Sequence, residues 1–412
     1  MTKQKTLDIA IPQYAKQIVE ALQSNQYQAY IVGGYLRDYF AGRTPKDIDI
    51  VTDATPEQIK TIFQHKCQLI GKRFRLAHVR VQKKIVEVST FRACASLGVA
   101  DARIRSHSDS GMILRDNLYG SLEEDMSRRD FTVNSLYYDP STRSLLDPFN
   151  GVNDVINKTI RFIGDTKKRL QEDPLRLLRA IRFSCKLGFA LEPHIEQAVP
   201  QALPKLQDIP AGRLFDEYTK LFLHGHGQTT FQQLCQFNAV SVLFPETMPY
   251  LNDQQTRAFI NQALQNTDKR FDEGKSIHPG FLIAVFLWPA QCQQLDILKQ
   301  EQSTTTHGLA YEAASLVLQR QAQHTALPKR FVTMIRQVWL MQSALANRKP
   351  KQVMTLLANI RFRAAYDFFV LRAETGGVKK QQDIANWWTT IQTQNKQGQM
   401  KMIEKLCIKR AS

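Results

Sequence analysis

The hydrophobic pattern of the chain changes near residue 150, and this change constrains the fold more than any other feature. Before it, alternating apolar residues predict strands at 27–32, 47–51, 75–82, 84–90, 135–138 and 144–146. Helices are expected at 9–24, at 34–40 and after Thr55, and a loop at 106–111. The first 150 residues therefore predict an α/β head in which helices cover a mixed sheet.

From about residue 155 the pattern is helical almost to the end, and no strand alternation stands out. Helices are expected at 173–187, 211–223, 228–237, 253–265, 280–287, 329–346, 350–358 and 361–374. The head is therefore followed by a long all-α body.

Asp47 and Asp49 stand two residues apart in the strand predicted at 47–51, so their carboxylates face the same side. Holding two like charges together is costly unless a cation offsets them. Mg²⁺ takes one or two protein carboxylates together with phosphate oxygens of a substrate. Two such ions can orient an attacking hydroxyl and stabilise a pyrophosphate leaving group.

Four further residues add context to this pair. Gly33 and Gly34 lie where the strand at 27–32 meets a helix, and backbone there can approach a phosphate closely. Arg37, in the first turn of that helix, is within reach of the same phosphate. Glu87 alternates with valines on the strand at 84–90. It either completes a three-carboxylate metal site or is an ordinary exposed strand residue.

The formal net charge of +17 is unevenly distributed. Residues 1–150 carry 21 Lys/Arg against 17 Asp/Glu, and the remainder carries 34 against 21. Such an excess attracts polyanions, of which nucleic acid is the commonest inside a cell. No uninterrupted apolar run is long enough to span a bilayer, and the start lacks a secretory signal. A cytoplasmic protein without integral membrane insertion is therefore expected.

Four motifs resemble the class II nucleotidyltransferase family, which contains tRNA CCA-adding enzymes and bacterial poly(A) polymerases. They are Ile31-Val-Gly-Gly-Tyr-Leu-Arg-Asp38, Lys46-Asp-Ile-Asp-Ile50, Arg128-Arg-Asp-Phe-Thr-Val-Asn134 and Glu172-Asp-Pro-Leu-Arg-Leu-Leu-Arg179. Their order and approximate spacing are those of the family. The resemblance implies a catalytic nucleotidyltransferase head at 1–150 and a helical neck that recognises the nucleotide base at 151–245. A helical RNA-binding body with a short basic C-terminus would follow at 246–412.

The resemblance also assigns roles within the head. Asp47 and Asp49 would hold two catalytic Mg²⁺ ions, and Asp130 would complete the catalytic set near the ribose and triphosphate of the nucleotide. Further nucleotide ligands would be Gly33, Gly34, Arg37, Arg128, Arg129 and Asn134.

The neck would contribute the base-recognition helix. Asp173 and Arg176 are three residues apart and would share a face of the helix predicted at 173–187, and Arg179 continues the stripe. A carboxylate and a guanidinium side by side can read the edge of a base. They can equally well hold each other.

Three segments resemble the poly(A) polymerase branch of the family: residues 71–79, 327–330 and 361–373. This branch would add AMP from ATP to RNA 3′ ends without a template, release pyrophosphate and mark RNA for decay, with the RNA-decay machinery as a partner. Lys329, Arg330, Arg361 and Arg363 are candidates for RNA contact, and exposed solubilising charge is an equally good interpretation of each.

Two other functions stay open at this point. A tRNA CCA-adding enzyme would use the same chemistry with a different specificity. A catalytically inactive RNA-binding protein would keep only the fold.

Overall fold

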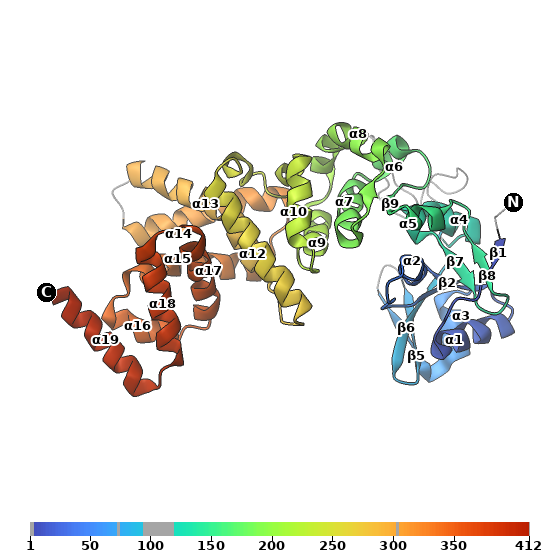
Figure 1. Cartoon of the computed structure of the whole chain (residues 1–412), viewed down its shortest axis with the longest axis horizontal. Helices are drawn as coiled ribbons and strands as arrows, with labels where there is room; N and C mark the ends of the chain where they lie inside the picture. Colours follow the sequence, from blue (N-terminus) through green and yellow to red (C-terminus); the bar gives the residue numbers. More distant parts are fainter. Residues whose placement is uncertain (1–3, 72–74, 94–118, 302–304, 412) are drawn as a thin grey trace. The chain divides into compact units, whose positions relative to one another are not determined.

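The computed structural model describes residues 4–71, 75–93, 119–301 and 305–411 (Figure 1). The chain forms two compact units, Met1–Ala202 and Leu203–Ser412. The loop expected at 106–111 and residues 72–74 of the segment 71–79 lie outside the described residues. The finer division at residues 150 and 245 remains a prediction.

The first unit contains a sheet of eight strands in the order β1-β8-β7-β2-β3-β6-β5-β4. The strands are β1 (Gln4–Thr6), β2 (Ala29–Val32), β3 (Asp49–Thr52), β4 (Cys67–Ile70), β5 (Leu76–Val81), β6 (Lys84–Thr90), β7 (Tyr137–Asp139) and β8 (Ser144–Leu146). β3 and β6 are parallel and the other neighbouring pairs are antiparallel, which confirms the predicted mixed sheet. The predicted strand at 47–51 starts only at Asp49, and β4 was not expected.

Eight helices lie in the described residues of this unit. They are α1 (Gln13–Ser24), α2 (Gly34–Phe40), α3 (Pro56–Phe63), α4 (Leu122–Arg128), α5 (Gly151–Ile156), α6 (Thr166–Glu172), α7 (Leu175–Leu187) and α8 (Pro193–Ala202). Short 3₁₀ turns lie at Gln64–Lys66 and Thr132–Asn134, and β9 (Thr159–Ile160) pairs in parallel with β10 (Ala190–Leu191). α3 starts as predicted, because the Thr55 hydroxyl caps it and Pro56 occupies the first turn.

Each face of the sheet carries its own apolar core, because successive strand side chains point to opposite faces. Ile50 and Val88 pack with buried residues of α1 and α3. Val51, on the opposite face, packs with Phe91 and with Met126 of α4. The sheet is therefore covered on both faces around β3, which fixes the orientation of that strand.

α7 begins at Leu175 and not at Asp173 as predicted. Asp173 is extended, with φ −147° and ψ 97°, and it ends α6. The reason is Pro174, whose ring disfavours the helical conformation of the residue before it. Asp173 therefore lies in the junction between α6 and α7, and its side chain does not continue the face of α7.

The second unit is helical throughout its described residues, as predicted, but the all-α pattern expected from about residue 155 is interrupted in the first unit by the short pair β9 and β10. Its helices are α9 (Ala211–Phe222), α10 (Gly227–Gln236), α11 (Val240–Leu243), α12 (Gln254–Asp272), α13 (Pro279–Glu301), α14 (Thr306–His324), α15 (Lys329–Asn347), α16 (Pro350–Leu357), α17 (Phe362–Thr375), α18 (Lys379–Thr393) and α19 (Lys396–Ala411), with 3₁₀ turns at Pro204–Asp208 and Met248–Tyr250. The helix expected at 280–287 covers only the first part of α13, and α14, α18 and α19 were not expected. Phe244 and Phe286 stack at 4.2 Å in the core.

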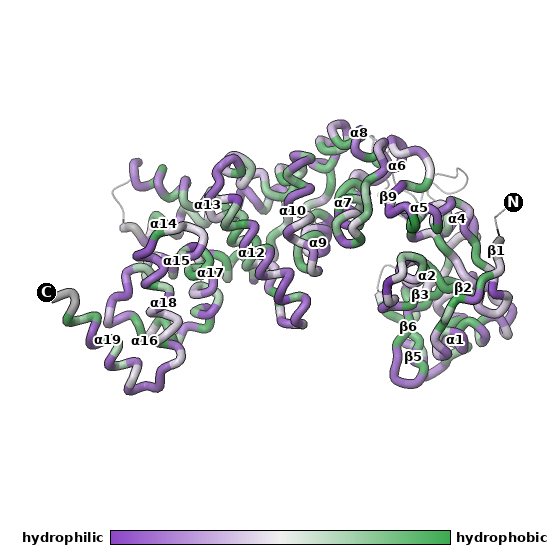
Figure 2. The backbone as a smooth tube through the Cα atoms, viewed as in Figure 1, coloured by the Kyte–Doolittle hydropathy of each residue, from purple (hydrophilic) through white to green (hydrophobic). Residues whose placement is uncertain are grey.

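α13 is long and apolar enough, by composition alone, to cross a membrane. Half of the relevant window is buried in the unit, where α13 packs against α14 and α15, and a core helix passes the same test. In Figure 2, hydrophobic and hydrophilic stretches alternate along the helices, as expected of helices with one buried side.

Replacing Gly151 with alanine tests how closely α5 approaches the segment that follows Asp130. A Cβ atom at Gly151 would lie 2.3 Å from the backbone oxygen of Thr132. We expect Gly151→Ala to lower the free energy of unfolding by about 1–3 kcal/mol. Gly212→Ala on α9 is the control, because its Cβ would meet no atom within 4 Å. Urea denaturation followed by circular dichroism should show no loss for Gly212→Ala, and equal stability of the two variants would contradict the packing.

Candidate active site

The carboxylates of Asp47 and Asp49 share one face of the sheet. Ile48 and Ile50, which alternate with them, are both buried in the same apolar core. The two aspartates therefore project from the opposite side of the strand, where both are exposed. This is the arrangement that the Asp-x-Asp spacing predicts.

Glu87 lies directly beside Asp49. The parallel pairing of β3 with β6 places these two residues in register, so their side chains leave the same face. His78 on β5 pairs with Glu87 and extends the polar row by one strand. Sequence analysis left the position of Glu87 open and did not single out His78, because strand register is not visible in local spacing.

The surroundings disfavour a charged Asp49. Desolvation by the surrounding protein, followed by repulsion from Glu87 and a smaller contribution from Asp47, raises the pKa of Asp49 to about 6, although Arg129 acts in the opposite direction. The residue nevertheless remains exposed to solvent. Negative charge is therefore crowded at this point, and a cation bound beside Asp49 would relieve it.

The carboxylates at this site could bind Mg²⁺ together with phosphate oxygens of a nucleotide. Within the described ranges, no three His, Cys, Asp or Glu side chains form a preassembled metal site. Mg²⁺ does not need one, because it binds through one or two carboxylates and takes its other ligands from phosphate and water. Asp47, Asp49 and Glu87 fit that coordination.

The Gly33 turn is built into the same region. Gly33 has φ +69°, and a Cβ atom there would lie 3.3 Å from Nη1 of Arg129, whereas one at Gly34 would lie 3.6 Å from Nη2 of Arg37. Arg37 donates to the side-chain oxygen of Asn134 at 2.8 Å, and Arg129 donates to the backbone oxygen of Asn134 at 3.3 Å. The structure thus brings these five predicted nucleotide ligands together.

A buried carboxylate holds the two arginines of the Arg-Arg-Asp motif. Asp125 accepts from Arg128 at 2.9 Å, from Arg129 at 3.3 Å and from the Tyr137 hydroxyl at 2.6 Å. Tyr137 also accepts from Arg129 at 2.6 Å. Burial alone would raise the pKa of Asp125, but Arg129 and Arg128 hold it below its usual range. Asp125 and Tyr137 fix where the guanidinium of Arg129 lies.

Two arginines of α7 hold Asp130. Arg176 donates to one carboxylate oxygen and Arg179 to the other, each at 2.8 Å. Burial alone would raise the pKa of Asp130, but Arg179 and Arg176 lower it. Asp173 pairs with Arg179 at 3.4 Å, whereas the buried Arg176 also donates to Glu172 at 2.7 Å. The four predicted residues meet, although Asp173 faces Arg179 and not Arg176.

Arg169 was not expected at the site. This buried arginine donates to the backbone oxygens of Arg128 at 2.9 Å and Arg129 at 2.5 Å. It also lies 3.4 Å from Glu172, which links it to Arg176. Arg169 therefore orients the backbone of the Arg-Arg-Asp motif. No spacing rule connects residues so far apart in sequence.

Asp125, in contrast, had a local signal. It precedes Arg128 by three residues and Arg129 by four, and such pairs meet on a helix surface. The hydrogen bond from Tyr137 to Asp125 had no such local signal, because it depends on how β7 packs against α4.

Further cations gather around Phe183 on α7. The guanidinium carbons of Arg37 and Arg182 lie 5.8 Å and 4.6 Å from the ring centre of Phe183. Burial, with Arg37, Arg182 and Lys46 as neighbouring charges, lowers the pKa of Lys186. These groups form a positive border that suits phosphate.

The candidate RNA-contact residues belong to the second unit. Lys329 and Arg330 are exposed at the start of α15. Arg361 precedes α17 and is half-buried, and Arg363 is exposed in its first turn.

Tyr137→Phe tests whether the buried hydroxyl positions Arg129. The variant loses both hydrogen bonds of that hydroxyl, so we expect the nucleotidyl transfer predicted above to slow by about tenfold or more. Tyr138→Phe is the control, because this equally buried hydroxyl donates to the backbone of Leu7 at 2.8 Å, away from the site. The melting temperatures should fall similarly. Equal transfer rates for the two variants would contradict the positioning role.

Three family profiles match the chain. The Poly A polymerase head domain matches residues 29–161, the "Probable RNA and SrmB- binding site of polymerase A" matches 188–251, and the "Polymerase A arginine-rich C-terminus" matches 302–411. The matched head segment contains the Asp47–Asp49 pair, Glu87 and Asp130.

Solved structures of low sequence identity share the fold. A CCA-adding enzyme in its apo form II aligns with TM-score 0.64 at 19% identity, over 92% of this chain and 82% of that one. A CCA-adding enzyme in complex with ATP aligns with TM-score 0.62 at 18% identity, over 91% and 81%. At such identities the likeness shows the fold alone.

Curated relatives are closer in sequence. Poly(A) polymerase I of Escherichia coli O157:H7 is 38% identical over 399 residues, which are 96% of this chain and 86% of the relative. Poly(A) polymerase I of Haemophilus influenzae is 40% identical over 396 residues, or 95% and 86%. The CCA-adding enzyme of Staphylococcus aureus strain MRSA252 is 34% identical over only 59% of this chain and 57% of that enzyme. The chain therefore belongs to the poly(A) polymerase I family of class II nucleotidyltransferases.

Proposed function

We propose that this protein polyadenylates RNA: it transfers AMP from ATP to the 3′-hydroxyl of RNA without a template. The 3′ oxygen forms a bond to the α-phosphorus in line with the breaking bond, and pyrophosphate leaves. The observation that carries the proposal is the shared face of Asp47 and Asp49, with Glu87 in register beside them. Identity with poly(A) polymerases over nearly the whole chain supports the choice of ATP and RNA.

Asp47 and Asp49, with Glu87 beside them, would hold Mg²⁺. When bound, Mg²⁺ supplies positive charge that favours ionisation of the RNA 3′-hydroxyl and neutralises the triphosphate. Arg37 and Arg129 lie at the Gly33 turn, where their positive charge would face the phosphates of the nucleotide while each stays paired with a carboxylate. Their positions are fixed in advance by Asn134 and Asp125, so no reorganisation is needed when charge develops.

Nucleotide selection is assigned to the start of α7. Asp173 and Arg179 form an acceptor and donor pair beside Asp130. Arg176 donates to Asp130 and to Glu172, and through Asp130 it helps to position Arg179. A base edge with one donor and one acceptor would replace the weak 3.4 Å contact between Asp173 and Arg179.

The finer assignments follow from this activity. The RNA 3′ end and ATP are the substrates, and tail addition would mark RNA for decay in the cytoplasm, with the decay machinery as a partner. The CCA-adding alternative loses support because the similarity to such an enzyme stops at 59% of this chain. The inactive alternative loses support because the acidic row and its arginines are intact.

Substituting the aspartate pair tests the proposal directly. We expect Asp47→Ala combined with Asp49→Ala to abolish incorporation from radiolabelled ATP while leaving circular dichroism and RNA affinity close to wild type. Asp53→Ala is the control, since Asp53 is an exposed aspartate just after the opposite end of β3. Elongation of RNA by the double variant would refute the assignment.

Supplying each nucleotide separately to a generic RNA tests specificity. We expect long tails with ATP alone. Arg176→Ala should reduce the ratio of kcat/KM for ATP to that for CTP by about tenfold, because Asp130 and the Asp173–Arg179 pair lose the support of Arg176. Arg161→Ala is the control, since Arg161 also bridges two carboxylates, Asp154 and Glu192, away from the site. Addition of C, C and A to truncated tRNA, or an unchanged ratio, would contradict this reading of α7.

A further inference from the structure

The helical unit contains a cavity of about 690 Å³ that the proposed reaction does not use. It lies between α12, α13, α15 and α17, where four cations and three carboxylates line it. Two of the carboxylates are already neutralised: Asp367 pairs with Arg363 at 3.0 Å and Glu273 with Lys275 at 2.7 Å. The cavity therefore keeps an excess of positive charge.

Arg361 is one of the lining cations that no ion pair neutralises within the described residues, together with Lys269 and Arg270. It lines the cavity immediately before α17, and no side chain caps the N-terminus of that helix. Among the residues that the structure describes, no carboxylate pairs with Arg361, and its buried Nε has no hydrogen-bond partner. A half-buried guanidinium without an acidic partner, next to the positive end of a helix, is suited to an external anion.

A second guanidinium, that of Arg330, lies on α15 outside the cavity lining. The Arg330 guanidinium lies 4.9 Å from the ring centre of Phe331, and the His278 ring packs against Phe331 at 5.1 Å. Burial, together with Arg361 and Arg330, lowers the pKa of His278. His278 lines the cavity, so the positive charge that Arg361 and Arg330 place around it favours an anion there.

The inner wall of the cavity is apolar. Phe281 and Leu282 of α13, Met334 of α15 and Val370 of α17 line it. A flat nucleobase can lie on such a wall, and a stacked base contributes about 1–3 kcal/mol of affinity in single-strand binding proteins. The volume admits one nucleotide with its phosphate.

We propose that this cavity binds one nucleotide of single-stranded RNA, with its phosphate at Arg361 and its base against the Phe281 wall. The proposal rests on the proposed function, because it supplies a hold on the RNA substrate away from the reacting end. It lies outside residues 188–251, to which the RNA-binding family description applies.

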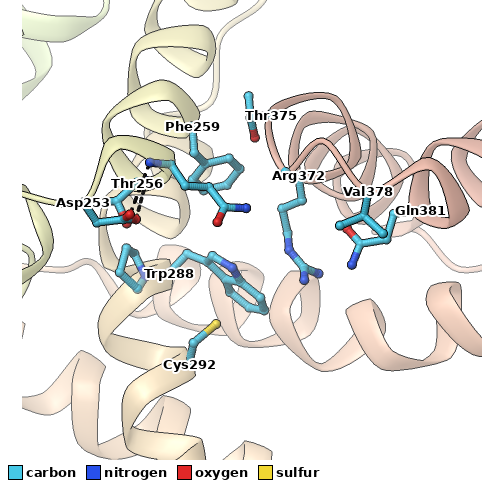
Figure 3. A pocket seen from close by; sticks show the side chains of 12 residues that line it. Asp253, Thr256, Phe259, Trp288, Cys292, Arg372, Thr375, Val378 and Gln381 are labelled. Atoms are coloured by element: carbon cyan, nitrogen blue, oxygen red, sulfur yellow. Dashed lines mark hydrogen bonds between the residues drawn. The ribbon is translucent and has the colours of Figure 1, made fainter.

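A smaller cavity of the helical unit, of about 260 Å³, offers a contrast (Figure 3). Its single arginine, Arg372, lies 4.4 Å from the ring centre of Trp288 and donates to Gln342 at 3.1 Å. That guanidinium is already engaged within the fold, so the cavity has the wrong size and charge for a nucleotide phosphate.

The test is affinity of the full-length protein for a fluorescein-labelled oligoadenylate, measured by anisotropy over a range of KCl concentrations. We expect Arg361→Gln to raise Kd about tenfold, as loss of one charged hydrogen bond implies. The slope of log Kd against log salt should fall by about 0.7, the value for one phosphate of a single strand. Ala364→Phe, which narrows the cavity without changing charge, should raise Kd and leave the slope unchanged.

Lys299→Gln is the control for general charge, because it removes one exposed cation, paired with Asp296 at 2.8 Å, near the far end of α13 and outside both matched C-terminal segments. Its Kd and slope should equal those of the wild type. Melting temperatures separate a structural role from a binding role: Arg361→Gln should melt with the wild type, since no ion pair is broken.

The outcomes are distinct. Wild-type Kd and slope in Arg361→Gln would overturn the proposal that the cavity binds RNA. ATP incorporation by the same variant would leave the proposed function intact. A rise in KM for ATP without a change in RNA affinity would show that the cations serve free nucleotide, which also overturns the RNA-binding proposal. If Lys299→Gln lowered RNA affinity as much as Arg361→Gln, the loss would reflect net charge alone, and the proposed nucleotide site would be refuted.

Discussion

Repulsion among Asp47, Asp49 and Glu87 is the constraint on which the rest of the first unit depends. Strand alternation places the two aspartates on one face, and the parallel register of β3 with β6 places Glu87 beside Asp49. The sheet itself cannot relax this crowding, because a one-residue slip would expose its apolar core. The pKa of Asp49, at about 6, is the visible consequence. The negative charge of these carboxylates must be neutralised, either by bound metal ions or by neighbouring arginines.

The built-in cations are positioned by buried acids. Asp125 and Tyr137 hold Arg129, and Arg176 and Arg179 hold Asp130. Removing one partner of such a buried pair typically costs about 3–5 kcal/mol, because the other charge is left without compensation. This penalty keeps each guanidinium in place. Positions are thereby set before a nucleotide arrives, which is how fixed charges contribute most to a reaction.

Local rules account for what the sequence predicted and for what it missed. Alternation and turn chemistry placed Asp47, Asp49 and Gly33, and the helical pattern gave the class of the second unit. The register that brings Glu87 to Asp49 is a property of paired strands and has no local signature. Asp173 does not share a helix face with Arg176, because Pro174 keeps it extended. The sequence contained this signal, since the residue before a proline disfavours the helical conformation. The buried Arg169 was missed because its partners are backbone oxygens some forty residues earlier in the chain.

Net charge is a poor guide to where a polyanion binds. The first unit carries 30 Lys/Arg against 23 Asp/Glu, but at its site the arginines are tied to carboxylates and serve to position one another. The second unit, with 25 against 15, has in Arg361 a cation without such a partner in the described chain. Salt screens exposed charges far more than buried pairs. The hold on RNA should therefore weaken at ionic strengths that leave the geometry of the catalytic arginines intact, which separates substrate retention from chemistry within one chain.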